Sequence, residues 1–249
     1  MIYTAGMARK PGNRSTRIRR TANDAAPAAT ARKRSGPRTA GANQAASYHH
    51  GALRNALLEA AERVLEREGL AGLTLRAVAR EAGVSHAAPT HHFGDLTGLV
   101  SELAAIGFTQ FNAAMAAARA AGGTPTEKAC ARAQAYVAYA QAHPGMYGLM
   151  FRTERLDMSR PSLCEAANAA FAGLAGAVAA NRQEQIPQET LSLEQGAAIA
   201  RAWSLVHGFT MLLLDGRLSD IVRRLPKGTD ADALLDAMLK ATIGPPPRP

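Results

Sequence analysis

The 249-residue sequence predicts an all-α fold, on the strength of three observations. Apolar residues recur at intervals of three and four, the spacing of one face of an α-helix. The period-2 alternation of β-branched residues that indicates a strand is missing, while alanine is abundant. Several segments also begin with side chains that cap helices. We therefore expect a series of helices without a sheet.

The first predicted helix spans about 51–68, and Gly69 ends it. One apolar stripe runs along this helix and comprises Leu53, Leu57, Ala60, Ala61, Val64 and Leu65. A stripe of this width needs a partner surface, so the helix should pack against the elements that follow it.

Two short helices with a tight turn between them come next. Thr74 can cap the second helix, Gly83 supplies the backbone freedom of the turn, and Ser85 can cap the third helix. Pro89 falls inside the third helix but close to its start, where a missing N–H costs at most one hydrogen bond. Three helices with this spacing describe a helix-turn-helix.

The remainder of the chain predicts a longer series of helices. Asp95 can cap a long helix that reaches about Ala121, where the sequence GGTP interrupts it. A short helix follows Pro144. Capping boxes, in which two side chains bond each other's backbone N–H, are predicted at TPTE (124–127), SLCE (162–165) and SLEQ (192–195). The last two start helices near 162–182 and 193–215, and a final helix spans about 230–242.

The excess positive charge lies in residues 1–46. The chain has a formal net charge of +9, and this segment holds ten Lys and Arg residues against one acid, Asp24, so the rest is neutral overall. With almost no large apolar side chains, the segment should be disordered. The Arg-rich, acid-poor composition also describes a transit peptide. Arg19 and Arg20 resemble a twin-arginine signal, but no apolar stretch follows them, which argues against export. An over-long start-site assignment stays open as an alternative.

Several classes of protein are disfavoured by what the sequence lacks. The most apolar stretch, 203–214, is interrupted and is short for a membrane span, so no membrane partner is expected. Two cysteines, Cys130 and Cys164, are too few for a disulfide scaffold. We interpret both as small core residues in preference to a thiol sensor. No nucleophile elbow or phosphate loop is present, so we expect neither an enzyme nor a cofactor.

The segment LTLRAVAREAGVSHAAPTHHFGD, with the amphipathic helix before it, resembles the DNA-binding domain of TetR-family transcriptional regulators over residues 51–100. Further along, HPGMYGLMF and AWSLVHGFTMLLLDGRL resemble the ligand-binding and dimerising region of a subgroup with a Trp-His-Gly signature. The resemblance implies a helix-turn-helix domain at 47–94 and a helical ligand-binding and dimerisation domain at 95–243. From composition, we expect a disordered basic tail at 1–46 and a disordered tail at 244–249.

The resemblance also implies which residues contact DNA. The candidates are Thr74, Arg76, Ser85, His86, Ala87, Thr90, His91 and His92. Thr90 stands where the family usually has an aromatic residue, and Leu96 where it usually has a lysine. Because residues 47–100 carry five Arg against six acids, we expect Arg32, Lys33 and Arg34 of the tail to supply attraction to phosphates. The histidines lack the spacing of a helical metal site, so no metal is expected.

The candidate ligand-binding residues are Met146, Tyr147, Met150, Phe151, Trp203 and His207. Met and aromatic side chains adapt to apolar ligands, although the first four can equally be ordinary core. Trp203 and His207 lie one helical turn apart and share a face. For His207, a buried histidine with a satisfied hydrogen bond is favoured over ligand contact.

These observations predict a cytoplasmic, nucleoid-associated bacterial homodimer that represses transcription at a palindromic operator of double-stranded DNA. The resemblance also implies that a small apolar effector releases it. The helices near 162–182 and 193–215 should pair across the twofold axis. The alternative is a DNA-binding or architectural protein that binds no ligand and is controlled by a protein partner.

Overall fold

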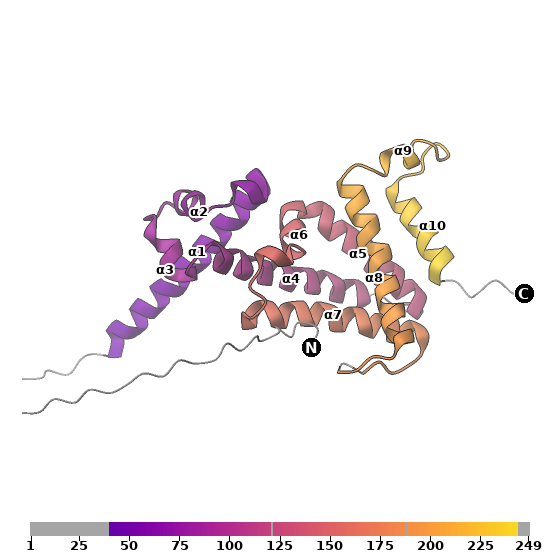
Figure 1. The fold of residues 1–249 in the computed structure, drawn as a ribbon, viewed down its shortest axis with the longest axis horizontal. Coiled ribbons are helices and arrows are strands. Elements are labelled where there is room, and N and C mark those ends of the chain that lie inside the picture. Colours follow the sequence, from indigo (N-terminus) through magenta and orange to yellow (C-terminus); the bar gives the residue numbers. More distant parts are fainter. Residues whose placement is uncertain (1–39, 121, 188, 244–249) are drawn as a thin grey trace, which may run out of the picture.

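The computed structural model describes residues 40–120, 122–187 and 189–243, and all regular elements within these ranges are helices (Figure 1). The all-α prediction is therefore confirmed. The tail residues Arg32, Lys33 and Arg34 and the segment 244–249 lie outside the described residues.

The N-terminal unit consists of α1 (Ala40–Gly72), α2 (Leu75–Glu81) and α3 (Ala87–Phe93), which we call the reading head. Helix α1 begins at Ala40. Residues 40–46, which were predicted to belong to the disordered tail, are therefore helical. The backbone leaves helical geometry at Gly69, with φ +68°, as the sequence predicted. Five of the six stripe residues are fully buried, and Leu53 is half-buried.

The turn between α2 and α3 matches the prediction except at Ser85. The Thr74 hydroxyl caps α2 by accepting from the backbone N–H of Ala77 at 3.1 Å, and Gly83 adopts φ +67°. Ser85 makes no side-chain cap. The chain is already helical at His86, and the backbone carbonyl of Ser85 accepts from the N–H of Ala88 at 3.0 Å. A backbone bond therefore does what the serine hydroxyl was expected to do.

The C-terminal domain begins with α4 (Leu96–Ala120), a long helix that runs from the reading head into the centre of the domain. Helix α4 packs against α7 (Pro161–Arg182) and α5 (Pro125–Ala142). The remaining elements are α6 (Pro144–Met150), a 3-10 turn at Thr153–Arg155, α8 (Leu193–Leu214), α9 (Ser219–Val222) and α10 (Ala231–Ile243). The 3-10 turn and α9 were not predicted, because elements of this length carry no periodicity.

Two of the three predicted capping boxes form. Thr124 with Glu127, and Ser192 with Gln195, each make both reciprocal bonds. The box predicted at 162–165 is wrong, because α7 starts at Pro161 with Arg160 before it, and the Ser162 hydroxyl donates to Glu102 instead. At the start of α4, Asp95 accepts from the N–H of Gly98 at 2.7 Å, as predicted.

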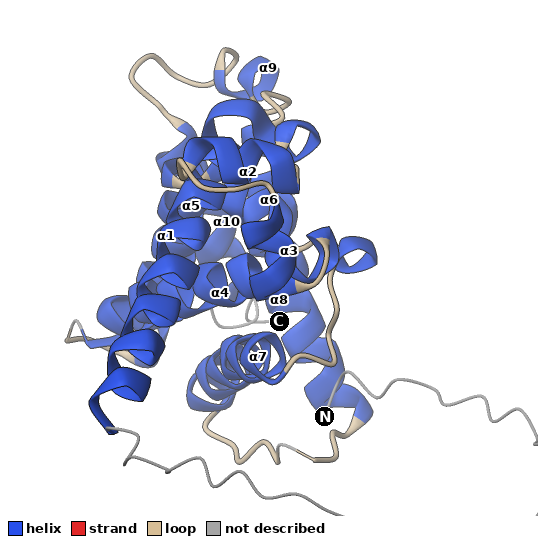
Figure 2. Cartoon of the chain, turned by 90° about the vertical axis from the view of Figure 1, so that its left-hand side faces the viewer, coloured by secondary structure: helices blue, strands red, loops and turns tan. Residues whose placement is uncertain are grey.

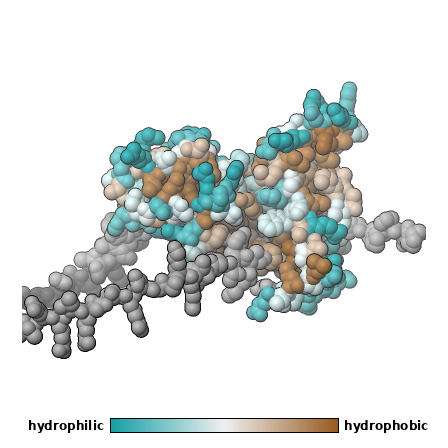
Figure 3. All heavy atoms as spheres, viewed as in Figure 1, coloured by the Kyte–Doolittle hydropathy of each residue, from teal (hydrophilic) through white to brown (hydrophobic). Residues whose placement is uncertain are grey.

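Helices α7 and α8 are each long and apolar enough to cross a membrane by length and composition alone, which corrects the expectation that no stretch is long enough. The core helices of water-soluble proteins pass the same test. Only 11% and 28% of their most apolar windows is buried within this chain, so both helices present an uncovered apolar side. Figure 3 shows hydrophobic side chains on the surface of the C-terminal domain. On α8, Leu193 at the start and Met211 and Leu212 near the end are exposed.

Candidate DNA-binding surface and effector cavity

Helix α3 keeps its helical form through Pro89 and separates an inner from an outer side. Pro89 and Phe93 are buried against the reading head, while Thr90 and His91 are exposed and His92 is half-buried. The proline is tolerated because it is the third residue of the helix, where a backbone N–H has no intrahelical partner to lose. The outer side of α3 is consequently polar and accessible.

The other candidates from the predicted DNA-binding set surround this outer side. Ser85, His86 and Ala87 are exposed at the start of α3, and Thr74 and Arg76 are exposed at the start of α2. Figure 2 looks onto this end of the molecule, with α1, α2 and α3 nearest the viewer. The structure therefore places Thr74 to His92 on one end of the chain, away from the C-terminal domain. Hydroxyl and imidazole groups of this kind can contact base edges and phosphates.

Several arginines of the reading head are occupied by internal ion pairs. Arg63 and Arg67 both bond Glu81, at 2.9 and 3.0 Å, and so hold α2 against α1. The hydrogen bonds from Arg63 and then Arg67 lower the pKa of Glu81. The exposed cations that remain on α2 are Arg76 and Arg80. The reading head therefore exposes few unpaired positive charges, in agreement with the five Arg and six acidic residues counted in residues 47–100.

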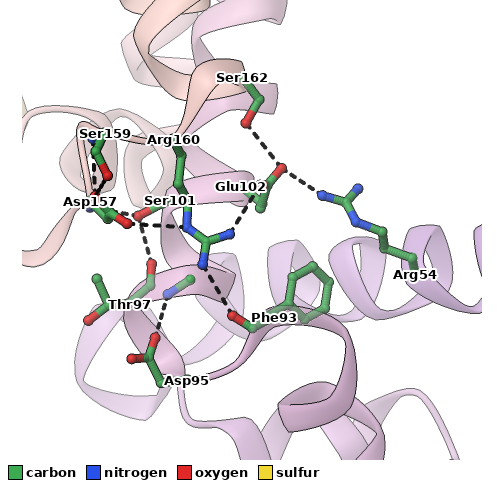
Figure 4. A network of polar contacts seen from close by, with 11 residues as sticks. Arg54, Phe93, Asp95, Thr97, Ser101, Glu102, Asp157, Ser159, Arg160 and Ser162 are labelled. Atoms are coloured by element: carbon green, nitrogen blue, oxygen red, sulfur yellow. Dashed lines mark hydrogen bonds and ion pairs between the residues drawn. The ribbon is translucent and has the colours of Figure 1, made fainter.

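A second ion-pair network joins the reading head to the start of α7 (Figure 4). Glu102 of α4 accepts from Arg54 of α1 at 2.6 Å and from Arg160 at 3.3 Å. Arg160 also donates to the backbone carbonyl of Phe93, the last residue of α3, at 3.3 Å. Its Nε is buried without a hydrogen-bond partner. One side chain next to α7 therefore holds both α4 and the end of α3.

The same junction is tightened by groups on the first turns of α4. The Ser101 hydroxyl accepts from the N–H of Asp157 at 2.8 Å, which fixes the loop before α7. Gly98 lies where a Cβ atom would collide with the Phe93 carbonyl and with the guanidinium of Arg160. The absence of a side chain at Gly98 is what allows α3, α4 and Arg160 to meet.

The C-terminal domain contains a cavity of about 580 Å³ among α4, α5, α6, α7, α8 and α10. Three of the predicted ligand-binding residues, Met150, Phe151 and Trp203, line it. Met146 and Tyr147 are fully buried and do not line the cavity, and neither does His207. A volume of this size is typical of sites for small molecules.

His207 belongs to a polar cluster behind the cavity wall. Its Nδ1 lies 2.9 Å from the hydroxyl of Tyr136 and 2.8 Å from that of Tyr147, and the two hydroxyls are 3.2 Å apart. Burial lowers the pKa of His207, raises that of Tyr147 to about 12 and raises that of Tyr136 further. All three groups are therefore neutral at pH 7, which agrees with the favoured interpretation of His207 as a hydrogen-bonded core histidine.

Sequence reasoning missed several residues that line the cavity. They are Phe108, Phe111, Arg132, Tyr136, Asn168, Phe171, Asn181, Arg182 and Arg201, among others. Tyr136 follows the three-to-four spacing of α5 and could have been proposed as an inward residue. The arginines could not, because a charged residue in an Ala-rich helix normally indicates a solvent-facing side.

The two cysteines are half-buried and free, and burial raises the pKa of Cys130, which disfavours a reactive thiolate. Within residues 40–120, 122–187 and 189–243, no group of three or more His, Cys, Asp or Glu side chains is placed to hold a metal ion.

A helix-turn-helix with an accessible third helix, followed by a helical domain that encloses a cavity, defines a DNA-binding regulator with a sensor domain. Sequence profiles agree with this geometry. The profile for bacterial regulatory proteins of the tetR family matches residues 57–103, and the profile for the tetracyclin repressor-like C-terminal domain matches residues 129–242. The chain belongs to the TetR family of transcriptional regulators, with a DNA-binding domain and a C-terminal ligand-binding domain.

Solved structures show the same fold. A protein of unknown function from Rhodococcus sp. RHA1 is 34% identical, with a TM-score of 0.62, and the match covers 78% of this chain and 95% of that one. A putative tetR family regulator from a Shewanella species is 18% identical, with a TM-score of 0.51 and coverage of 75% and 95%.

The regulator FadR from Bacillus subtilis, in complex with stearoyl-CoA, is 16% identical, with a TM-score of 0.56 and coverage of 76% and 97%. No curated protein sequence matches the chain. Together the matches point to a DNA-binding regulator rather than an enzyme. Membership of the Trp-His-Gly subgroup stays a prediction.

Proposed function

We propose that this regulator is a repressor that a small, largely apolar effector releases from a palindromic operator. The observation that carries the proposal is the pairing of an accessible, polar α3 with an unfilled cavity of about 580 Å³ on the same chain. The ligand-independent alternative would be favoured by a filled core in the C-terminal domain, and such a cavity argues against it.

The contacts around Arg160 suggest how an effector would act on DNA binding. Helix α7 lines the cavity along much of its length, and Arg160 at its start bonds Glu102 of α4 and the Phe93 carbonyl of α3. An effector that binds one position of α7 better than another shifts the equilibrium between two positions of the reading head. The size of the response is set by the difference in effector affinity between the two states.

We propose that α7 and α8 form the dimer interface. Their apolar sides are uncovered within the chain, and small residues on α7 permit the close approach of a second copy. A twofold dimer places two reading heads on one side of the DNA, which requires half-sites about one helical turn apart. The dimer would be a cytoplasmic protein that resides on the nucleoid.

The DNA-binding residues are proposed to be those exposed on α2 and α3, with Thr90 and His91 at the centre. Selection of bound sequences from random duplex DNA should give a palindrome. In fluorescence anisotropy, His91→Ala and Thr90→Ala should each weaken operator binding by about fivefold to a hundredfold, the cost of one lost base contact. Gln141→Ala, exposed at the end of α5, is the control and should leave the affinity unchanged. Recovery of no shared sequence would overturn the operator proposal.

We propose that Arg32, Lys33 and Arg34 add sequence-independent attraction to phosphates. A deletion of residues 1–39 leaves α1 complete from Ala40 onward. It should weaken operator binding and reduce the dependence of affinity on salt, because fewer counterions are released. An unchanged affinity with an unchanged salt slope would show that the tail takes no part in binding.

A further inference from the structure

Histidine is concentrated in the reading head. Five of the seven histidines of the chain lie between positions 49 and 92, and the other two, His143 and His207, belong to the C-terminal domain. Residues 47–100 carry five Arg against six acids, which is a formal charge of −1 while histidine is neutral, and five added protons would make it +4. The charge of the DNA-binding end of the chain therefore depends strongly on histidine.

Two of these histidines lie on the outer side of α3. His86 directly precedes the helix, His91 lies in its last turn, and both are exposed. Thr90 follows His86 by four residues and so shares its face. His92 is half-buried, with its ring centroid 5.5 Å from that of His91. Since residues 85–93 contain no Lys, Arg, Asp or Glu, a DNA phosphate that approaches α3 meets imidazole as the ionisable group of this segment.

Helix α3 packs against α2 and α4, whose acidic side chains make bonds elsewhere. The charged groups of these elements near α3 are Arg76, Arg80 and Glu81 on α2, Asp95 just before α4, and Glu102 on α4. The bonds of the three acids run from Glu81 to Arg63 and Arg67, from Asp95 to the backbone N–H of Gly98, and from Glu102 to Arg54 and Arg160. A DNA phosphate can therefore supply an anionic partner that α2 and α4 do not.

We propose that the reading head takes up protons at His86 and His91 when it binds DNA, so that its affinity for DNA rises as the pH falls from 8 to 6. An imidazole in water takes up a proton near pH 6.5, and a neighbouring phosphate favours the charged form. The charged form adds the attraction to phosphates that a head with few unpaired cations otherwise lacks. This inference rests on the proposed DNA-binding surface and adds a control of that surface by pH.

The sign and size of the effect follow from the linkage between protons and DNA. Because the complex holds more protons than the free protein, affinity increases as the pH falls. If a phosphate moves the protonation midpoint of one imidazole from about 6.5 to about 7.5, the affinity at pH 6 exceeds that at pH 8 by about sixfold. Two such groups give about fortyfold.

The test is the affinity of the full-length protein for rhodamine-labelled duplexes, measured by anisotropy at pH 6, 7 and 8 and at constant ionic strength. The selected operator is compared with a mixed-sequence duplex of equal length. The operator should be bound about fortyfold more tightly at pH 6 than at pH 8, and a change below about twofold would overturn the inference. Because burial lowers the pKa of His207, acid destabilises the fold, which opposes this effect and cannot produce it.

Variants assign the protons to α3. His86→Gln and His91→Gln together keep hydrogen-bonding side chains, so the affinity at pH 8 should stay within about threefold while the pH effect falls below about threefold. His143→Gln is the matched control and should keep the full effect, since this histidine lies at the start of α6. A full pH effect in the double variant would overturn the inference.

A fixed charge provides a gain-of-function test. His86→Arg should raise the affinity at pH 8 by about fivefold and leave only the contribution of His91 to the pH effect, because the guanidinium is charged throughout this range. An affinity at pH 8 that does not rise would contradict the view that a charge at this position attracts phosphate.

The outcomes separate this inference from the proposed function. Duplexes that are bound with the expected pH effect, while selection recovers no shared sequence, would refute the operator proposal and support this inference. An operator that is bound equally well at pH 6 and pH 8 would do the reverse. Failure to bind either duplex at any pH would overturn both.

Discussion

The contact between Glu102 and Arg160 gives the sharpest test of how the reading head is held. Glu102→Gln removes the carboxylate that bonds both Arg54 and Arg160, and Arg160→Met removes the guanidinium but keeps an apolar side chain of similar length. Both changes affect the junction in Figure 4 without touching α3 side chains on the DNA-facing side. A double-mutant cycle isolates the energy of the pair itself.

The expected magnitude lies between the values for surface and buried ion pairs. The side chains of Glu102 and Arg160 are 16% and 30% exposed, so solvent screens the pair in part. Exposed pairs contribute about 0.2–1 kcal/mol, and the loss of one member of a fully buried pair costs about 3–5 kcal/mol. We therefore expect each single variant to lose about 1–2 kcal/mol of unfolding free energy, with a coupling of about 0.5–1 kcal/mol.

The measurement is urea unfolding at one fixed protein concentration, because dimerisation makes stability depend on concentration. Arg152 and Glu154, which lie 3.8 Å apart and are each 62% exposed, provide a control cycle whose coupling should be close to zero. A Glu102–Arg160 coupling below about 0.3 kcal/mol, the usual limit of additivity, would refute the view that this ion pair stabilises the junction.

Three further predictions concern the turn, the junction and the histidine cluster. Thr74→Ala should cost about 1 kcal/mol of unfolding free energy in urea titrations because α2 loses its cap, whereas Thr74→Ser should cost little. Gly98→Ala should destabilise the protein by about 1–3 kcal/mol through collision with Phe93 and Arg160; Gly148→Ala, where a Cβ meets nothing within 4 Å, should be neutral or stabilising. Because burial lowers the pKa of His207, the unfolded chain takes up the proton first, so stability should fall as the pH drops below about 6.5. His207→Gln should flatten that dependence between pH 7.5 and 5.5, and an unchanged slope would contradict the assignment.

Much of the fold could be predicted from the sequence because its determinants are local. The spacing of apolar residues defined the first helix, and side chains next to the backbone they bond defined the starts of α2, α4, α5 and α8. The same reasoning from neighbouring residues gave two wrong predictions, the side-chain cap at Ser85 and the capping box at 162–165. At Ser85 a backbone carbonyl makes the bond, and at Ser162 a distant carboxylate, Glu102, takes the hydroxyl.

The candidate DNA-binding surface was also accessible to sequence reasoning, since Thr74 to His92 lie within a single short motif. The exposure of Thr90 and His91 and the burial of Pro89 and Phe93 follow from helical spacing alone. Half of the predicted ligand-binding residues line the cavity, because apolar periodicity identifies inward-facing residues without distinguishing a cavity wall from a packed core.

The sequence by itself determined the helices, their caps and the polar outer side of α3, because each depends on residues within a few positions of one another. Only the tertiary structure decided that Arg54, Glu102 and Arg160 meet at one junction, and that residues from α4, α5, α7 and α8 line one cavity. These groups are brought together by the packing of whole helices, and no local pattern records which distant helix a side chain will face.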